Sequence, residues 1–170
     1  MAFIDRMKAQ DYIDKTREYL DYVEEHLNNV KKAFNELSKI CDGMWWVGDD
    51  FTWHTLRGQV ICHDMSKFSK EELVQYRDSF YPVTTSDKVN SGVEDAWKHH
   101  KLVNFHHHES VKTFIDIVHM VIDWTAMGYK FDDTAQQYYE SNKDKIHLSE
   151  EHENFMYEIF DKISQHSEKR

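Results

Sequence analysis

The sequence is poor in residues that interrupt helices. Its 170 residues include only five glycines and one proline. So few chain breakers exclude a loop-rich or all-β architecture and favour an all-α one. The chain also has only two cysteines, Cys41 and Cys62, which are too few for a disulfide framework. We therefore expect a protein of the reducing cytoplasm.

Long apolar runs and excess positive charge are also missing. No run reaches the roughly 18 apolar residues that a membrane-spanning helix needs. The N-terminal segment lacks the apolar core of a signal peptide. Asp and Glu total 31 against 21 Lys and Arg, which gives a net charge of -10. An acidic chain is a poor general binder of nucleic acid or of anionic membranes, so neither is an expected partner.

The apolar residues that are present follow helical spacing. From Leu20 to Cys41 they recur at alternating steps of three and four, which predicts an amphipathic helix that packs in a bundle or, alternatively, in a coiled-coil dimer. The sequence as a whole predicts one compact all-α domain over 1–170 with six or seven helices. Ser69 and Glu72 have the spacing of a capping box, and Gly128 is expected to end the most apolar helix. The expected helices cover about 11–41, 53–67, 69–81, 93–101, 111–127, 134–142 and 150–167, with loops over 42–52 and 83–92.

Histidine is the residue in clear excess. Of 12 histidines, eight lie between His54 and His119, and five lie within the ten residues from His99 to His108. Histidine is the commonest metal ligand in proteins and titrates near neutral pH. The sequence therefore indicates a metal site, with a solvated histidine-rich turn as the alternative.

Carboxylates accompany the histidines at two places. Asp116, His119 and Asp123 share one face of an otherwise apolar helix, where a buried carboxylate is costly unless it is paired or binds metal. A polar stripe at the edge of a bundle is the alternative interpretation. His63 and Asp64 follow an apolar helical turn. Imidazole and carboxylate together suit Mn, Fe, Co, Ni or Zn, without selecting among them.

The order of these residues resembles the HD-domain superfamily of metal-dependent phosphohydrolases, which has an early His, a His-Asp doublet and a late helical Asp. Ser66 replaces the usual glycine after the doublet. More narrowly, four short motifs spread over about residues 20–145 look like the bacterial and phage family DUF5662. These motifs are HDMSKF at 63–68, AWKHH at 96–100, NFHH at 104–107 and DW at 123–124. The resemblance implies an HD-like helical bundle in a bacterial cytoplasm, or in the host cytoplasm if a phage encodes it.

The resemblance also implies a ligand set for one or two divalent ions. The first ion would be held by His26, His63, Asp64 and Asp123. Asp64 would bridge to a second ion held by one residue of each histidine pair, His100 and His107, although His99 and His106 stay open as alternatives. Those two and His119 would otherwise orient ligands or donate a proton. The residues expected to act in catalysis are Asp64, Lys67 as a charge for a substrate phosphate, His99 and Asn104.

The expected activity is hydrolysis of a nucleotide or another small phosphorylated compound. A metal-activated water would attack phosphorus. The tryptophans offer surfaces on which a base can stack, namely Trp45, Trp46, Trp53 and Trp97. Two alternatives stay open, an HD-type di-iron oxygenase and a non-catalytic helical module stapled by metal. A homodimer is compatible with all three.

Overall fold

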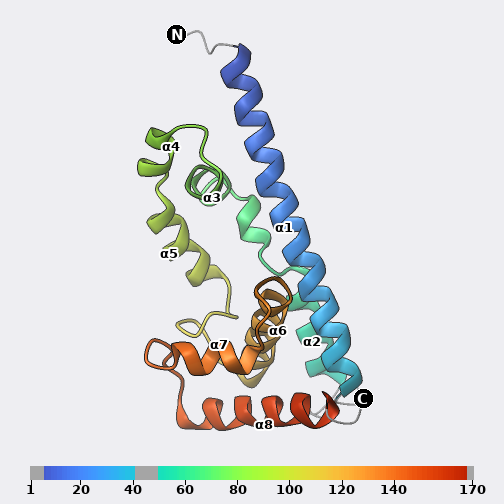
Figure 1. Cartoon of the computed structure of the whole chain (residues 1–170). Coiled ribbons are helices and arrows are strands. Elements are labelled where there is room, and N and C mark those ends of the chain that lie inside the picture. Colours follow the sequence, from blue (N-terminus) through green and yellow to red (C-terminus); the bar gives the residue numbers. More distant parts are fainter. Residues whose placement is uncertain (1–5, 41–49, 168–170) are drawn as a thin grey trace. The chain divides into compact units, whose positions relative to one another are not determined.

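The computed structural model describes residues 6–40 and 50–167, and within them it confirms the all-α fold class. These residues form eight α-helices and one 3₁₀ helix and contain no strand, so the helix count exceeds the predicted six or seven. Figure 1 shows the elements in chain order. The chain forms two compact units. Unit 1 comprises Met1–Glu25 and Asp64–Val103, and unit 2 comprises His26–His63 and Asn104–Arg170. The single domain over 1–170 stays a prediction.

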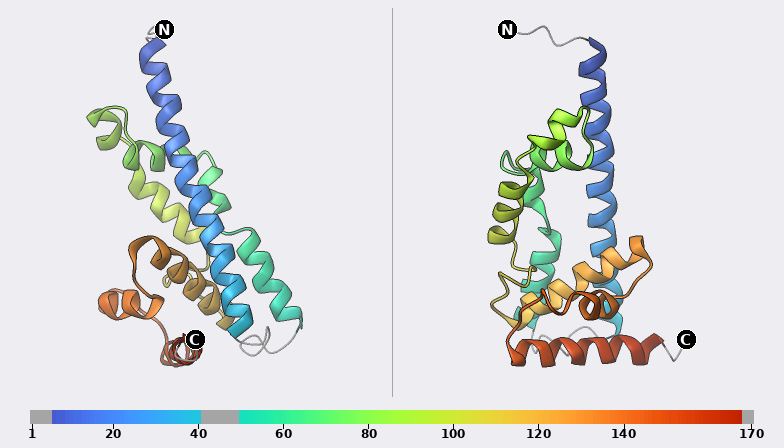
Figure 2. Two further views of the ribbon diagram at one scale, coloured as in Figure 1. Left: turned by 45° about the vertical axis from the view of Figure 1, so that its right-hand side comes forward. Right: turned by 60° about the vertical axis from the view of Figure 1, so that its left-hand side comes forward.

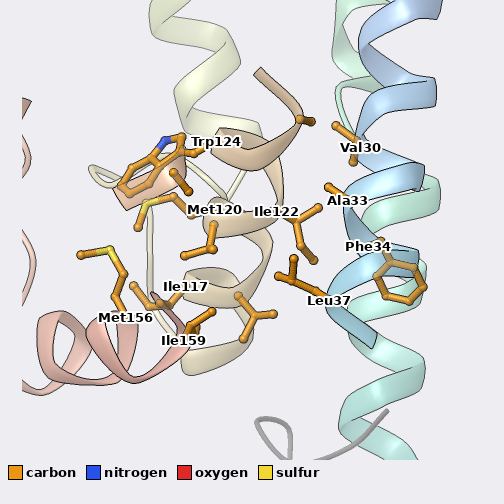
Figure 3. Close-up of a cluster of buried hydrophobic side chains, with 14 of the residues drawn as sticks. Val30, Ala33, Phe34, Leu37, Ile117, Met120, Ile122, Trp124, Met156 and Ile159 are labelled. Atoms are coloured by element: carbon orange, nitrogen blue, oxygen red, sulfur yellow. The ribbon is translucent and has the colours of Figure 1, made fainter. Parts of the chain in front are cut away.

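Unit 2 is built around helix α6 (Phe114–Phe131), which contacts α2 (Asp50–Ile61), α7 (Ala135–Asn142) and α8 (Glu150–Ser167). The second half of α1 (Arg6–Ile40) completes its core. In Figure 3 the labelled side chains of α1 and of α8 lie on opposite sides of α6. Almost every side chain of α6 from position 117 to 122 is apolar and buried, which explains why this helix is apolar around most of its circumference.

The buried face of α1 differs by one position from the predicted stripe. Val23, Val30 and Leu37 are buried as predicted, but Leu20 is 37% exposed and Tyr19 takes the core position beside it. His26 is likewise buried at a core position of this face. The predicted helix end at Cys41 and the loop over 42–49 lie outside the described residues. Residues 50–52, predicted as loop, begin α2.

Helix α6 runs past Gly128, which was predicted to end it, and its C-cap is Asp132. The glycine serves close packing instead. A Cβ atom at position 128 would lie 2.3 Å from the backbone oxygen of Asp133, so only a residue without a side chain fits there. At the other end, Thr113 and Asp116 form a capping box that satisfies backbone N–H groups of the first turn.

The substitution Gly128→Ala is expected to lower the free energy of unfolding by about 1–3 kcal/mol, because backbone must move to admit the methyl group. The matched control is Gly58→Ala in α2, where an added Cβ meets nothing within 4 Å. There the higher helix propensity of alanine should raise the free energy of unfolding by up to about 1 kcal/mol. Urea denaturation followed by circular dichroism measures both. Equal effects of the two substitutions would contradict the packing argument.

Unit 1 contains the 3₁₀ helix η1 (Met65–Phe68) and helices α3 (Leu73–Phe80), α4 (Thr85–Val89) and α5 (Val93–Val103). Helix α3 contacts the other three elements. Figure 2 shows these elements in two further views of the ribbon. The predicted helix over 53–67 is wrong beyond Ile61, because the chain turns at 62–64 and continues as η1. The loop predicted over 83–92 contains α4, which starts with a capping box at Thr84.

The capping box predicted between Ser69 and Glu72 is not formed. Helix α3 begins four residues later than predicted, at Leu73, and Glu72 is its N-cap residue without a side-chain capping bond. The Glu72 carboxylate instead binds two histidines of α5, described below. None of the described helices is both long and apolar enough to span a bilayer.

Candidate functional site

Unit 2 gathers four histidines and one aspartate into a buried group, here called the histidine cluster. Its members come from two helices and two connecting segments. Each histidine side chain is at most 6% exposed, and the aspartate is 14% exposed. The cluster consists of His26 on α1, His63 after α2, His106 in the segment after α5, and His119 and Asp123 one turn apart on α6.

Three donor atoms of the cluster form a small triangle. His26 Nε2 lies 3.0 Å from His63 Nε2 and 3.2 Å from Asp123 Oδ1, and the third side, from His63 Nε2 to Asp123 Oδ1, is 3.4 Å. Ligands about 2.0–2.1 Å from one tetrahedral ion are separated by about 3.3 Å, and those around an octahedral ion by about 2.9 Å. The triangle therefore has the size of one face of a metal coordination shell.

The second nitrogen of His63 contacts another histidine. His63 Nδ1 lies 2.9 Å from His119 Nε2, so one of the two nitrogens carries the proton between them. When that proton is on His63 Nδ1, His63 Nε2 presents its lone pair to the triangle, as a metal ligand must. His119 can thus orient His63, which is one of the roles predicted for it.

His106 lies against the face of His63 and not at the edge of the triangle. The two rings are stacked, with centroids 4.3 Å apart and planes at 29°. Nitrogen lone pairs lie in the plane of an imidazole ring, so nearly parallel stacked rings do not aim their lone pairs at one point. Although His63, His106 and His119 also bring donor atoms within 4.8 Å of one another, the ring geometry favours the triangle with His26 and Asp123.

The charge of Asp123 is stabilised by its neighbours. Burial by itself would raise the pKa of this carboxyl, but hydrogen bonding with His26 and His63, together with the electrostatic effect of His63 and His106, holds the pKa well below its usual range. The carboxylate is therefore ionised at neutral pH. An ionised carboxylate beside two imidazoles is a donor set that divalent transition metals accept.

Unit 1 contains a second buried polar group, which begins at Asp64. This residue has left-handed backbone angles, with φ 56° and ψ 17°, and its side chain makes no capping bond to η1. Asp64 Oδ2 accepts from Lys67 Nζ at 2.6 Å, and Asp64 Oδ1 lies 3.2 Å from His100 Nε2. A left-handed non-glycine residue stores strain, and such residues gather at functional sites.

Glu72 completes this group, and the sequence analysis missed it as a site residue. Its side chain is fully buried, with Oε1 2.7 Å from His99 Nδ1 and Oε2 2.8 Å from His100 Nδ1. Trp97, predicted as a stacking surface, stacks on His100 with ring centroids 5.7 Å apart. Trp45 and Trp46 and the side chain of Trp53 lie outside the described residues.

The structure thus assigns the predicted ligands to different units. Three of the four residues predicted for the first ion, His26, His63 and Asp123, meet in unit 2, whereas Asp64 belongs to unit 1. Of the residues predicted for a second ion, Asp64 and His100 share unit 1. His107 belongs to unit 2, where its ring centroid lies 4.4 Å from that of His106.

Two other predicted polar residues have distinct surroundings. Asp116 does not join Asp123 in the histidine cluster, because its carboxylate accepts from the backbone N–H of Thr113 at 2.9 Å and from Gln59 Nε2 at 3.1 Å. Its burial is explained by helix capping. Asn104, predicted as catalytic, follows α5 directly and is half-buried.

The fold and these two groups define an all-α protein with buried histidine–carboxylate clusters. The chain belongs to the family described as a family of unknown function (DUF5662), whose model matches residues 15–164. No curated protein and no solved structure matches the chain. The family description assigns no activity to its members.

Proposed function

We propose that the protein is a metal-dependent phosphohydrolase of HD type that acts on a nucleotide or another small phosphorylated compound. The observation that carries this proposal is the triangle formed by His26, His63 and Asp123, with sides of 3.0, 3.2 and 3.4 Å. Three buried donor atoms at ligand spacing, in the sequence order of the HD superfamily, support a divalent ion such as Mn, Fe, Co, Ni or Zn at this place.

A divalent ion held there would lower the pKa of a bound water and polarise a phosphoryl oxygen. The protein's own contribution is to orient and protect the ligands. His119 holds the His63 ring through Nδ1, and burial of the cluster excludes bulk water from the histidine nitrogens. Lys67 and His99 in unit 1 remain the proposed phosphate-binding and proton-transferring groups, and Asp64 in unit 1 and Asn104 in unit 2 are further catalytic candidates.

The proposed substrate is small because the chain is acidic. A net charge of -10 opposes the approach of a long polyanion, while a bound divalent ion or the Lys67 ammonium can still attract a phosphate group. For the same reason, we do not propose that the protein binds nucleic acid in general. The proposed compartment is the cytoplasm of a bacterium, or of a host cell if a phage encodes the chain. A homodimer is compatible with the proposed function.

The test is elemental analysis of the purified protein joined to a phosphate-release screen. We expect at least one transition-metal ion per chain and release of phosphate from one or more nucleotides. Removal of the ion with a chelator should abolish that release, because the proposed nucleophile is a water activated by the ion. Re-addition of Mn, Fe, Co, Ni or Zn, one at a time, should restore it with at least one ion.

Two outcomes would contradict the proposal in different ways. If the protein is purified without metal and binds none of the five ions, the proposed metal site does not exist. A protein that binds metal and loses its fold on chelation, yet hydrolyses no phosphorylated compound, would be a metal-stapled helical module. Circular dichroism on the chelated sample separates these cases.

One observation favours a second candidate, an iron-dependent oxygenase. Two histidines and one carboxylate with further coordination positions open are the ligand set of many non-haem Fe(II) oxygenases, and His26, His63 and Asp123 provide that set. Oxygen uptake by the Fe(II)-loaded protein, without activity in the Mn, Co or Ni forms, would favour the oxygenase. Phosphate release supported by the Mn, Co or Ni form would exclude it.

A further inference from the structure

Glu72 binds two neighbouring histidines with one carboxylate. Its Oε1 lies 2.7 Å from His99 Nδ1 and its Oε2 lies 2.8 Å from His100 Nδ1. The glutamate comes from the N-cap of α3 and the histidines from α5, so the contact joins two helices of unit 1. The Glu72 side chain is fully buried, and a buried carboxylate persists only when it is well paired.

The two contacts determine where the histidine protons lie. An ionised carboxylate only accepts hydrogen bonds, so each short contact needs a proton on the Nδ1 atom that faces it. At His100, Ser66 Oγ also lies 3.2 Å from Nδ1, which places two oxygen acceptors around that one N–H group. A neutral imidazole with its proton on Nδ1 has a lone pair on Nε2.

We propose that Glu72 is a positioning residue that holds His99 and His100 with their protons on Nδ1, so that both rings offer Nε2 as an acceptor. For His100 this acceptor lies 3.2 Å from Asp64 Oδ1, and two acceptors at that distance repel each other unless a cation lies against both. His99, at 33% exposure, keeps its Nε2 as a base. The inference that Asp64 and His100 together bind a metal ion rests on the proposed function.

The surrounding charge supports a cation at this place. Asp64 and Glu72 are two buried carboxylates, and the ammonium of Lys67 is paired with Asp64. Burial, and then the negative charge of Glu72 and Asp64, raise the pKa of the buried hydroxyls of Tyr19 and Tyr76. Both hydroxyls therefore stay protonated, and they report the negative potential that a divalent ion would offset.

The experiment is nitrogen-15 NMR of the histidine rings in the zinc-loaded protein, at about pH 8, where free histidine is neutral. Zinc is diamagnetic, and the substitutions His99→Gln and His100→Gln assign the two rings. In the wild type, both rings should carry the proton on Nδ1. In Glu72→Gln, the amide offers one acceptor and one donor, so one ring should move its proton to Nε2. The zinc affinity reported by the His100 ring should fall about 10–100-fold.

The matched control is Glu71→Gln, which removes the same charge one residue earlier. Glu71 contacts Lys70 at 3.5 Å and should leave both rings unchanged. The proposal is overturned if a wild-type ring carries its proton on Nε2 or on both nitrogens, or if Glu72→Gln leaves both rings as they were. Should Glu72→Gln not fold, the wild-type spectrum still decides. If the protons lie as expected but the protein has no phosphohydrolase activity, the proposed function is contradicted and the role of Glu72 is not.

Discussion

Replacing His63 with alanine is expected to lower the affinity for a divalent ion roughly 10³-fold and to abolish phosphate release. The triangle loses one of three donor atoms, and a structural zinc site with four ligands is worth about 10–16 kcal/mol. The loss of one ligand at about 4 kcal/mol corresponds to about three powers of ten. Competition with a chromophoric chelator measures the affinity, and the phosphate-release assay measures the activity.

The control for this substitution is His54→Ala. His54 lies on α2, nine positions before His63, and its side chain is exposed. It removes the same imidazole from the same region without touching the histidine cluster. Metal affinity and activity should stay within a factor of two or so of the wild type, as for most exposed positions. A His63→Ala protein that keeps the affinity of its control would show that the triangle is not the metal site.

Replacing Asp64 is expected to affect both stability and activity. Asp64→Asn leaves Lys67, which is 16% exposed, without the carboxylate 2.6 Å away, and breaking such a pair costs about 3–5 kcal/mol. Asp64→Ala should cost about 1 kcal/mol more, because asparagine tolerates the left-handed backbone at φ 56° and alanine does not. Both variants should lose phosphate release. Urea denaturation ranks their stabilities.

A double substitution separates the two effects of Asp64. In Asp64→Asn with Lys67→Met, the ammonium that lost its carboxylate is removed as well, so most of the lost stability should return. Phosphate release should not return, because the carboxylate proposed for catalysis and the ammonium proposed to bind phosphate are both absent. Full activity of Asp64→Ala, or recovery of activity in the double variant, would refute the assignment of Asp64.

Local spacing was enough to predict most of the helices, and long-range packing explains two places where the prediction failed. Helix α8 has the predicted ends, Glu150 and Ser167, because acidic and apolar residues both mark it. Gly128 looks like a helix end in the sequence, and only the nearby Asp133 backbone shows that it marks close packing. Similarly, Leu20 and Tyr19 are both apolar neighbours, so the sequence could not tell which of them faces the core.

The residues of the candidate site could be predicted where they belong to motifs with a fixed order. They could not be predicted where only burial shows that a residue belongs to the site. His26, His63 and Asp123 were selected by order, and the structure brings them together. Which residue of the pair at 106–107 joins the histidine cluster could be seen only in the structure, which buries His106 against His63. Glu72 gave no signal, because a glutamate near a helix start is ordinarily an exposed capping residue, and only its full burial between His99 and His100 distinguishes it.

Anomalous X-ray diffraction from crystals of the metal-loaded protein, recorded at the absorption edge of the bound ion, tests the central claim most directly. The account predicts an anomalous peak about 2.0–2.2 Å from His26 Nε2, His63 Nε2 and Asp123 Oδ1. It is contradicted if these three atoms keep their 3.0–3.4 Å separations and no peak lies among them, or if the ion binds only at other residues.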